Sequence, residues 1–138
     1  MTDDIIMETT ADARAFFRQD RYAAMSGMTV EEASLRHAVI GLRLNETHRN
    51  AVGGLMGGVL CTMADFACAV ASNFGTGTGS YVSADAHISF LNACKGETLT
   101  AEAMCVKQGS RLSFYEVSVT DELKTPVARA SFTMYRVR

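Results

Sequence analysis

Asp65 is the residue of this sequence whose surroundings best predict chemistry. It is the only charged residue in an apolar run from Val59 to Ala71, and Gly57 and Gly58 lie just before that run. A carboxylate among apolar neighbours loses solvation, and enzymes use such acids as bases or nucleophiles. Glycines at a helix start expose N–H groups that can stabilise an oxyanion. Both features also have structural interpretations, as a hydrogen-bonded Asp inside a subunit interface and as a tight turn.

The elements around this acid predict an α+β fold. Thr9 or Thr10 can cap a short helix that ends near residue 20, and alternating apolar residues predict a strand within 28–44. A polar loop over 45–55 precedes a long apolar helix over about 57–73. Four further strands follow, at about 81–91, 98–107, 112–120 and 127–137. Short breaks predict that successive strands pair antiparallel, although their spatial order stays open. A curved sheet wrapped around the helix would cover its apolar sides.

The strand over 81–91 alternates between two predicted faces. Ser83 shares one face with Asp85, His87 and Ser89. The opposite face carries Val82, Ala84, Ala86, Ile88 and Phe90. The small residues near its middle leave room for the helix.

Length and charge restrict the function classes. The 138 residues predict one domain, and a net charge of -2 excludes the broad basic surface that nucleic acid binding needs. The apolar run is too short for a membrane span, and the acidic start at Met1–Asp4 is unlike a secretory signal. We therefore expect a cytoplasmic protein with no nucleic acid or membrane partner.

Cysteine and histidine spacing predicts no metal site. The four cysteines form no C-x-x-C pair and lie in segments that we expect to be core, which suits a reducing compartment. His37, His48 and His87 are not at ligand spacing either. We expect all of these residues to serve packing.

A family resemblance enters with the loop before the helix. The stretch Asn50–Gly58, followed by Asp65, resembles the N-x-x-G-x-x-H-G-G-x(6)-D signature of hot-dog-fold acyl-CoA thioesterases of the phenylacetate-pathway (PaaI-like) type. The resemblance continues through 81–92 and 107–111, and covers roughly 28–137. It implies a hot-dog fold with five or six strands around one helix, in homodimers that often pair into homotetramers. Residues 1–27 would then be a helical flank, and 28–138 the thioesterase-like core of a single domain 1–138.

The resemblance also assigns roles to residues. Asp65 is implied to be the base or nucleophile, and the Gly57 N–H is implied to polarise the thioester carbonyl. Asn50 would orient the thioester or water, and Ser83 would hold the attacking water. Coenzyme A is part of the substrate, so no separate cofactor is implied. Its implied contacts are Met56, Gly58, Phe90, Lys95, Gly109, Ser110 and Arg111, with Lys107 as a further cation near the groove mouth.

One residue departs from the signature. Met56 occupies the position of the family histidine, and its thioether cannot donate a hydrogen bond. We still expect hydrolysis of an aromatic or medium-chain acyl-CoA, because the oxyanion donor is a backbone group. The alternative is a non-catalytic protein that binds acyl-CoA or another hydrophobic ligand. A hot-dog dehydratase is disfavoured, since no histidine lies near the helix start.

Helix geometry predicts that the active site is shared between two chains. Gly57 and Asp65 are eight residues apart, which is roughly 12 Å along one helix. A reacting carbon must lie about 3 Å from its nucleophile, with its oxygen similarly close to the oxyanion donor. In a two-fold dimer, Gly57 of one chain can face Asp65 of the other. Asn50 should then accompany Gly57, and Ser83 should accompany Asp65.

Overall fold

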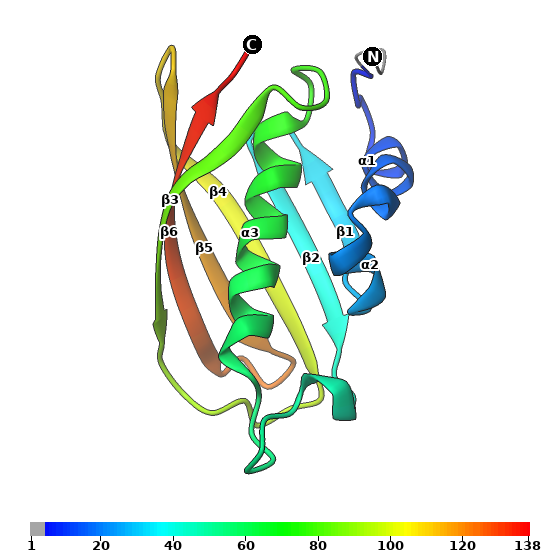
Figure 1. The fold of residues 1–138 in the computed structure, drawn as a ribbon, viewed down its shortest axis with the longest axis vertical. Helices are drawn as coiled ribbons and strands as arrows, with labels where there is room; N and C mark the ends of the chain where they lie inside the picture. The colour runs from blue at the N-terminus through cyan, green and yellow to red at the C-terminus, as the bar shows by residue number, and fades with distance from the viewer. Residues whose placement is uncertain (1–4) are drawn as a thin grey trace.

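A six-stranded antiparallel sheet curves around one long helix (Figure 1). The computed structural model describes residues 5–138, so the acidic start at Met1–Asp4 lies outside the described residues. The strands lie in the order β1-β2-β4-β5-β6-β3. Their bounds are β1 Thr29–Ser34, β2 His37–Arg43, β3 Tyr81–Phe90, β4 Thr98–Gln108, β5 Leu112–Asp121 and β6 Pro126–Arg136. The predicted hot-dog architecture is confirmed, with six strands.

The central helix α3 (Gly57–Asn73) has the predicted bounds. Its apolar residues pack into the concave face of the sheet, where Met63, Ala67 and Val70 have no exposed surface. Inward residues of the strands complete this core, among them Ile40, Leu99 and Val117. A helix that is apolar on most sides needs such a wrapping sheet. Nothing in residues 5–138 forms a helix long and apolar enough to cross a membrane.

The first predicted strand is a hairpin of two strands. β1 and β2 pair antiparallel, with Ser34 opposite His37. Between them Arg36 has a φ of 63°, in the left-handed region that non-glycine residues seldom adopt. The prediction of one strand over this segment was wrong because neither Gly nor Pro marks the turn.

The prediction that all successive strands pair is wrong at β3. β4, β5 and β6 form an antiparallel meander, but β3 pairs with β6 and lies at a sheet edge. β4 instead lies between β2 and β5. The connection over 91–97 passes from β3 at one edge to β4 inside the sheet, below the start of α3 (Figure 1).

A β-bulge changes which face of β3 carries Ser83. Ser83 is opposite Met134 and Asp85 is opposite Thr133, so Ala84 is an extra residue in the ladder. Ser83 therefore lies on the inner, helix-facing side of β3 with Ala86 and Ile88. Asp85 points outward. Strict alternation, which placed Ser83 with Asp85, was wrong here. Bulges often re-aim side chains beside active sites.

The N-terminal flank consists of short helices that lie against β1. These are α1 (Thr10–Phe16), the 3-10 turn η1 (Phe17–Gln19) and α2 (Arg21–Met25). Thr9 caps α1 as predicted, in a capping box with Asp12. The Arg14 Nε donates to the Val30 carbonyl at 2.9 Å. Phe17 meets Phe66 of α3 edge-on, with 5.9 Å between ring centres, which brings the end of the flank close to Asp65.

Candidate functional site

Asp65 and Ser83 meet on the inner side of the sheet. The Ser83 hydroxyl donates to Asp65 Oδ1 at 2.7 Å, and it also lies 3.6 Å from the Met134 sulfur. α3 supplies the acid, and the β3 bulge turns the hydroxyl towards it. The structure therefore brings together these two predicted residues.

The prediction that Asp65 is buried is wrong for the single chain. Its side chain is exposed, although Met63, Ala64, Phe66 and Ala67 around it are buried. The apolar sequence correctly predicts that α3 is a core helix. It does not show which of the helix positions faces outward, because that depends on where the sheet ends.

A cavity of about 330 Å³ opens beside this pair. Asp65 and Ser83 form its polar part, and Asp85, which points to the other side of β3, borders it. The rest of its lining is small or apolar, namely Cys61, Ala84, Ala86, Ile88 and Phe132. Cys61 is exposed here, so the prediction that every cysteine lies in the core is wrong for this residue. The cavity offers an apolar space next to a carboxylate that holds a hydroxyl.

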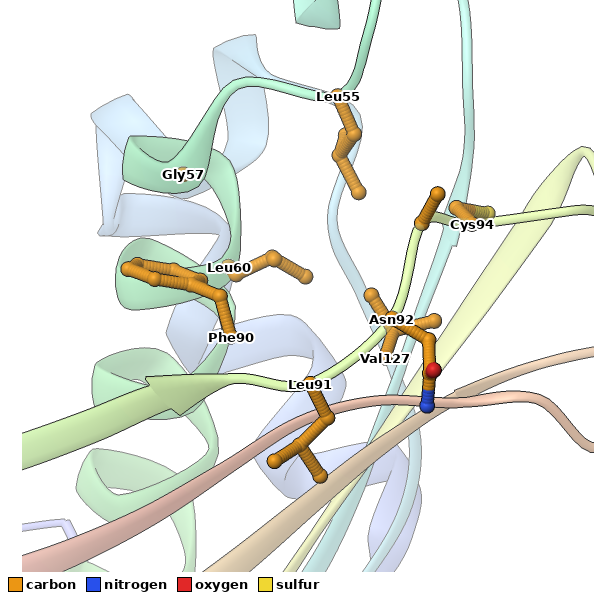
Figure 2. A pocket seen from close by; sticks show the side chains of 9 residues that line it. Leu55, Gly57, Leu60, Phe90, Leu91, Asn92, Cys94 and Val127 are labelled. Atoms are coloured by element: carbon orange, nitrogen blue, oxygen red, sulfur yellow. The ribbon is translucent and has the colours of Figure 1, made fainter.

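The start of α3 lines a separate cavity of about 430 Å³. Figure 2 shows the Phe90 ring lying beside α3 next to Gly57, with Leu55 and Leu91 at the other sides of the space. A Cβ at Gly57 would lie 3.1 Å from Phe90 Cζ, so this position favours glycine. Among residues 5–138, no side chain caps the helix start. The Val59 N–H donates to the Met56 carbonyl, and Gly57 is the first-turn residue that lines this cavity, so its N–H is the candidate donor to a ligand there.

Asn50 has a structural task in the loop before α3. Its Oδ1 accepts the N–H groups of Val52 at 3.1 Å and Gly54 at 2.9 Å. These bonds hold the turn that leads to Met56 and Gly57. The role of Asn50 towards a substrate stays a prediction.

Met56 lies at the N-cap of α3 with an exposed side chain, beside Gly58. Both residues line a cavity of about 460 Å³ on the flank side of the helix, with Tyr22, Met25 and Val59 among the other lining residues. Buried His48 connects this region to the flank, because its Nε2 lies 2.7 Å from the Ser26 carbonyl oxygen and its Nδ1 accepts the Asn45 N–H.

The predicted coenzyme A contacts form two groups, at opposite ends of the sheet. Lys95 lies in the connection between β3 and β4, next to Cys94, which lines the Gly57 cavity. Gly109, Ser110 and Arg111 form the turn between β4 and β5, at the other end of the sheet (Figure 1). The eleven residues of β4 separate these ends by roughly 35 Å. One chain therefore does not bring both sets to one ligand. Lys107 is exposed near the far end of β4.

Asp121 is a carboxylate that sequence reasoning missed. Its Oδ2 accepts the N–H groups of Lys95 at 2.9 Å and Gly96 at 3.0 Å, and its Oδ1 accepts those of Leu123 and Thr125. Burial acts to raise the pKa of Asp121, but hydrogen bonds from the N–H groups of Thr125, Lys95 and Gly96 outweigh burial and lower the pKa to about 2. Asp121 thereby anchors the loop that borders the Gly57 cavity.

The remaining candidates for metal binding do not gather. Among residues 5–138, no three His, Cys, Asp or Glu side chains are placed to hold an ion. His37 pairs with Glu102 at 2.7 Å, and His87 is exposed on the edge strand.

The hot-dog fold and the site residues described above are those of a thioester hydrolase. Residues 52–128 match the thioesterase superfamily, which is more than half of the chain, so the chain belongs to that superfamily. The matched range contains Gly57, Asp65 and Ser83. The chain has an acyl-CoA thioesterase type of hot-dog fold, as the resemblance implied.

Individual relatives agree with this assignment. The chain is 27% identical to human acyl-coenzyme A thioesterase 13 over 85% of this chain and 81% of the human protein. It superposes on the PaaI protein of the E. coli phenylacetic acid degradation operon with a TM-score of 0.84 and 26% identity, over 91% of each chain. The Streptococcus mutans protein smu.793, solved bound to acetyl-CoA, gives a TM-score of 0.73 and 28% identity over 80% of this chain and 88% of that one.

Proposed function

We propose that this protein hydrolyses acyl-CoA thioesters whose acyl group is aromatic or of medium chain length. The observation that carries the proposal is the Ser83–Asp65 hydrogen bond on the wall of an apolar cavity of about 330 Å³. A cavity of this size and lining favours a ring or a medium chain. Asp65 takes a proton from a water held by Ser83 as that water attacks the thioester carbon; the C–S bond then breaks, and coenzyme A leaves as a thiolate that takes up the proton. In the variant pathway the Asp65 carboxylate attacks first and displaces the coenzyme A thiolate, and water then cleaves the anhydride to the free acid and Asp65.

The Gly57 N–H completes this site from a second chain. Gly57 and Asp65 line separate cavities, and roughly 12 Å of helix lies between them. β3 is a ten-residue edge strand whose one neighbour among residues 5–138 is β6, so its outer edge can pair with another copy. Antiparallel pairing of two β3 strands produces a two-fold dimer, and a pair of such dimers would give the tetramer that the resemblance implies.

We propose one register for that pairing. Residues directly opposite in an antiparallel ladder point to the same face, so inward residues of β3 must oppose inward residues of the second copy. In the proposed register Ala86 opposes Ile88, both of which point inward, and the two-fold axis passes through His87. This register places the partner's Phe90 beside Ala84, next to Ser83. Because Phe90 contacts Gly57 within each chain, the oxyanion donor of one chain arrives at the acid of the other.

A cysteine at the axis tests this register. His87→Cys places two thiols opposite each other across the two-fold axis, at a Cβ separation that a disulfide can span. We expect a disulfide-linked dimer after mild oxidation, whereas a thiol at outward-facing Ser131 of β6 should give none. Absence of cross-linking at position 87 would reject this register.

The same pairing assembles the coenzyme A site. Antiparallel strands bring the β4–β5 turn of one chain, with Gly109, Ser110 and Arg111, towards the end of the other chain that carries Lys95. The resulting groove would have cations for the coenzyme A phosphates and backbone donors for its pantetheine arm. Binding of acetyl-CoA by the similar Streptococcus mutans protein supports a coenzyme A thioester as the ligand.

The chemistry needs only an acid, a backbone N–H and water, so we propose that no cofactor takes part. The four cysteines are free, which supports the proposal of a reducing, cytoplasmic location.

A thiol-release assay tests the proposed function. Phenylacetyl, hydroxybenzoyl and straight-chain CoA thioesters are incubated with the protein, and kcat/KM is compared across them. We expect release with at least one aromatic or medium-chain thioester. The second candidate, a non-catalytic acyl-CoA binding protein, is favoured by Met56 in place of histidine. Tight binding of these thioesters with no thiol release would establish it.

A further inference from the structure

Two adjoining cavities form a groove between α2 and α3. The flank helix α2 lies on the side of α3 away from β3 (Figure 1). The cavities have volumes of about 350 Å³ and 460 Å³, and Tyr22 of α2 and Thr62 of α3 line both of them. The first also contains Asp65, and the second also contains Met25 and Met56. We name the pair the flank groove. Asp65 borders this groove on one side and the cavity beside β3 on the other.

The lining residues follow the flank groove in order along both helices. On α3, Asp65 lines only the first cavity, Thr62 lines both, and Gly58 lines only the second. On α2, Tyr22 lines both cavities and Met25 lines only the second. The two helices therefore run in opposite directions along the groove. Seven residues separate Asp65 from Gly58, so the floor of the groove is roughly 10 Å long.

Exposed apolar side chains gather in the second cavity. Tyr22, Met25 and Met56 are 66%, 77% and 52% exposed, and all three line it. A cluster of exposed apolar side chains that lines a hollow is typical of a site for an apolar ligand. The Thr62 hydroxyl donates to the Gly58 carbonyl at 2.9 Å, which leaves the Thr62 methyl group for the groove. Methionine side chains adapt to a flexible partner, which favours a straight chain over a rigid ring.

Polar residues lie at the two ends of the flank groove. Asp20 lines the first cavity with Asp65, at the end where a polar thioester would lie. Arg49 lines the second cavity beside Met56, whose N–H donates to the His48 carbonyl at 2.9 Å. A charged side chain disfavours the end of an apolar chain. The groove therefore has a polar start, an apolar middle and a charged far end.

We propose that the flank groove binds the distal part of a straight acyl chain, and that Tyr22, Met25 and Thr62 determine the preferred chain length. The inference rests on the proposed function, in which the thioester carbon lies beside Asp65. An extended chain advances about 1.25 Å per carbon, because bonds of about 1.5 Å meet at near-tetrahedral angles. The groove therefore favours chains of about eight to ten carbons over aromatic acyl groups, since about eight carbons span its floor.

The proposed dimer leaves this path open. There the partner's Phe90 lies beside Ala84 and fills part of the cavity beside β3. The flank groove lies on the other side of α3, away from the paired β3 strands (Figure 1). An acyl chain that starts beside Asp65 therefore continues along α3 towards Met56.

The flank would then contribute to substrate selection. The match to the thioesterase superfamily covers residues 52–128, so α3 lies inside it and α2 lies outside it. Phe17 packs on Phe66 and holds the flank against α3. The wall that measures the chain thus comes from a segment outside the matched range.

The first test places a charge in the far cavity. Thiol release from butanoyl-, octanoyl-, decanoyl- and hexadecanoyl-CoA is measured for wild type and Met25→Lys. We expect kcat/KM for decanoyl-CoA to fall about tenfold in Met25→Lys, as for lost burial of about two methylenes, and kcat/KM for butanoyl-CoA to stay within about twofold. Met104→Lys is the matched control, because Met104 is exposed on β4 between inward-facing neighbours, and it should behave as wild type. Equal chain-length dependence in Met25→Lys and wild type would overturn the proposal.

The second test blocks the groove nearer to Asp65. Thr62 is three residues from Asp65, so a ring at this position should stop the chain after about four carbons. We expect Thr62→Phe to prefer butanoyl-CoA, whereas Thr62→Val, which is similar in size to threonine, should keep the wild-type preference. Thermal unfolding checks that both variants fold. A folded Thr62→Phe that still prefers decanoyl-CoA would contradict the groove as the chain site.

Binding separates this inference from the proposed function. Calorimetry measures the affinity of decanoyl-CoA and of coenzyme A alone for Asp65→Asn, and for a double variant that also carries Met25→Lys. We expect decanoyl-CoA to bind the double variant about tenfold more weakly, with the affinity for coenzyme A unchanged. Equal affinities for decanoyl-CoA would reject the groove. Absence of thiol release by the wild-type protein would instead contradict hydrolysis, and the calorimetry would still decide where the chain binds.

Discussion

Asp65 and Asp121 are carboxylates of one chain with opposite environments. Asp121 is buried and accepts the backbone N–H groups of Lys95, Gly96, Leu123 and Thr125. Asp65 is exposed and accepts one hydroxyl, from Ser83. An acid whose oxygens are all occupied holds loops together and has no capacity for a substrate. An acid with free acceptor sites beside a cavity can take a proton, so the count of partners separates the structural acid from the chemical one.

The largest effect that would test this comparison is loss of activity at Asp65. Asp65→Asn should lower kcat by at least about 10²-fold, as expected for loss of a positioned base, and should leave the unfolding midpoint unchanged or higher. Asp85→Asn is the matched control, because Asp85 lines the same cavity without accepting from Ser83. It should retain activity within a few fold. Thiol release by Asp65→Asn close to wild type would show that Asp65 is structural as well.

Subunit mixing tests whether a second chain supplies the oxyanion donor for the site at Asp65. Asn50→Ala and Asp65→Ala chains should each be inactive alone, but a heterodimer contains one site with both defects and one with none. Random exchange should therefore restore about a quarter of wild-type activity, since half of the dimers are mixed and each mixed dimer has one of two sites. Exchange is verified by mass spectrometry of tagged chains. Verified exchange with no recovery would contradict the shared site.

The opposite result is expected for substitution of Asp121, which should lower stability more than catalytic activity. Because the folded pKa of Asp121 is lowered to about 2, the stability from its ionised form is present above the usual Asp range and is lost as pH falls through 2. Asp121→Asn should lower the unfolding midpoint at neutral pH by several degrees, because the amide NH₂ would face backbone donors. It should also flatten the pH dependence of stability between about 4 and 2.

Thermal unfolding from pH 2 to 7 measures both effects, with Glu116→Gln as an exposed control. A pH dependence equal to that of wild type would show that Asp121 does not hold the loop.

The smallest expected effect concerns Met56 at the start of α3. Met56→His restores a donor that the thioether lacks, and the exposed position accepts it without repacking. We expect kcat to rise a few fold, or the preferred acyl group to change, with an unchanged unfolding midpoint. The acyl-CoA panel measures this. Identical kinetics on every thioester would mean that residue 56 has no part in catalysis.

Local pattern was enough to predict most elements and to single out Asp65 and Gly57. A largely apolar run between Gly57 and Asn73 defines α3, and its bounds agree with the structure because a helix start with glycines and a polar end are local signals. The later strands were predicted to within a residue or two for the same reason. The pairing of Ser83 with Asp65 could be inferred only through the family resemblance, since eighteen residues separate them.

Tertiary structure alone decided the features that make the site. Whether Asp65 is exposed depends on which strand ends the sheet, and β3 reaches that edge by pairing with β6, far away in sequence. The bulge at Ala84 turns Ser83 inward because of its pairing with β6, and packing of Phe17 against Phe66 holds the flank on α3. Composition and periodicity determine which residues are helix, strand and core, since those preferences are local. Long-range strand pairing and packing decide which side chains meet, because their free energy exists only when distant segments come together.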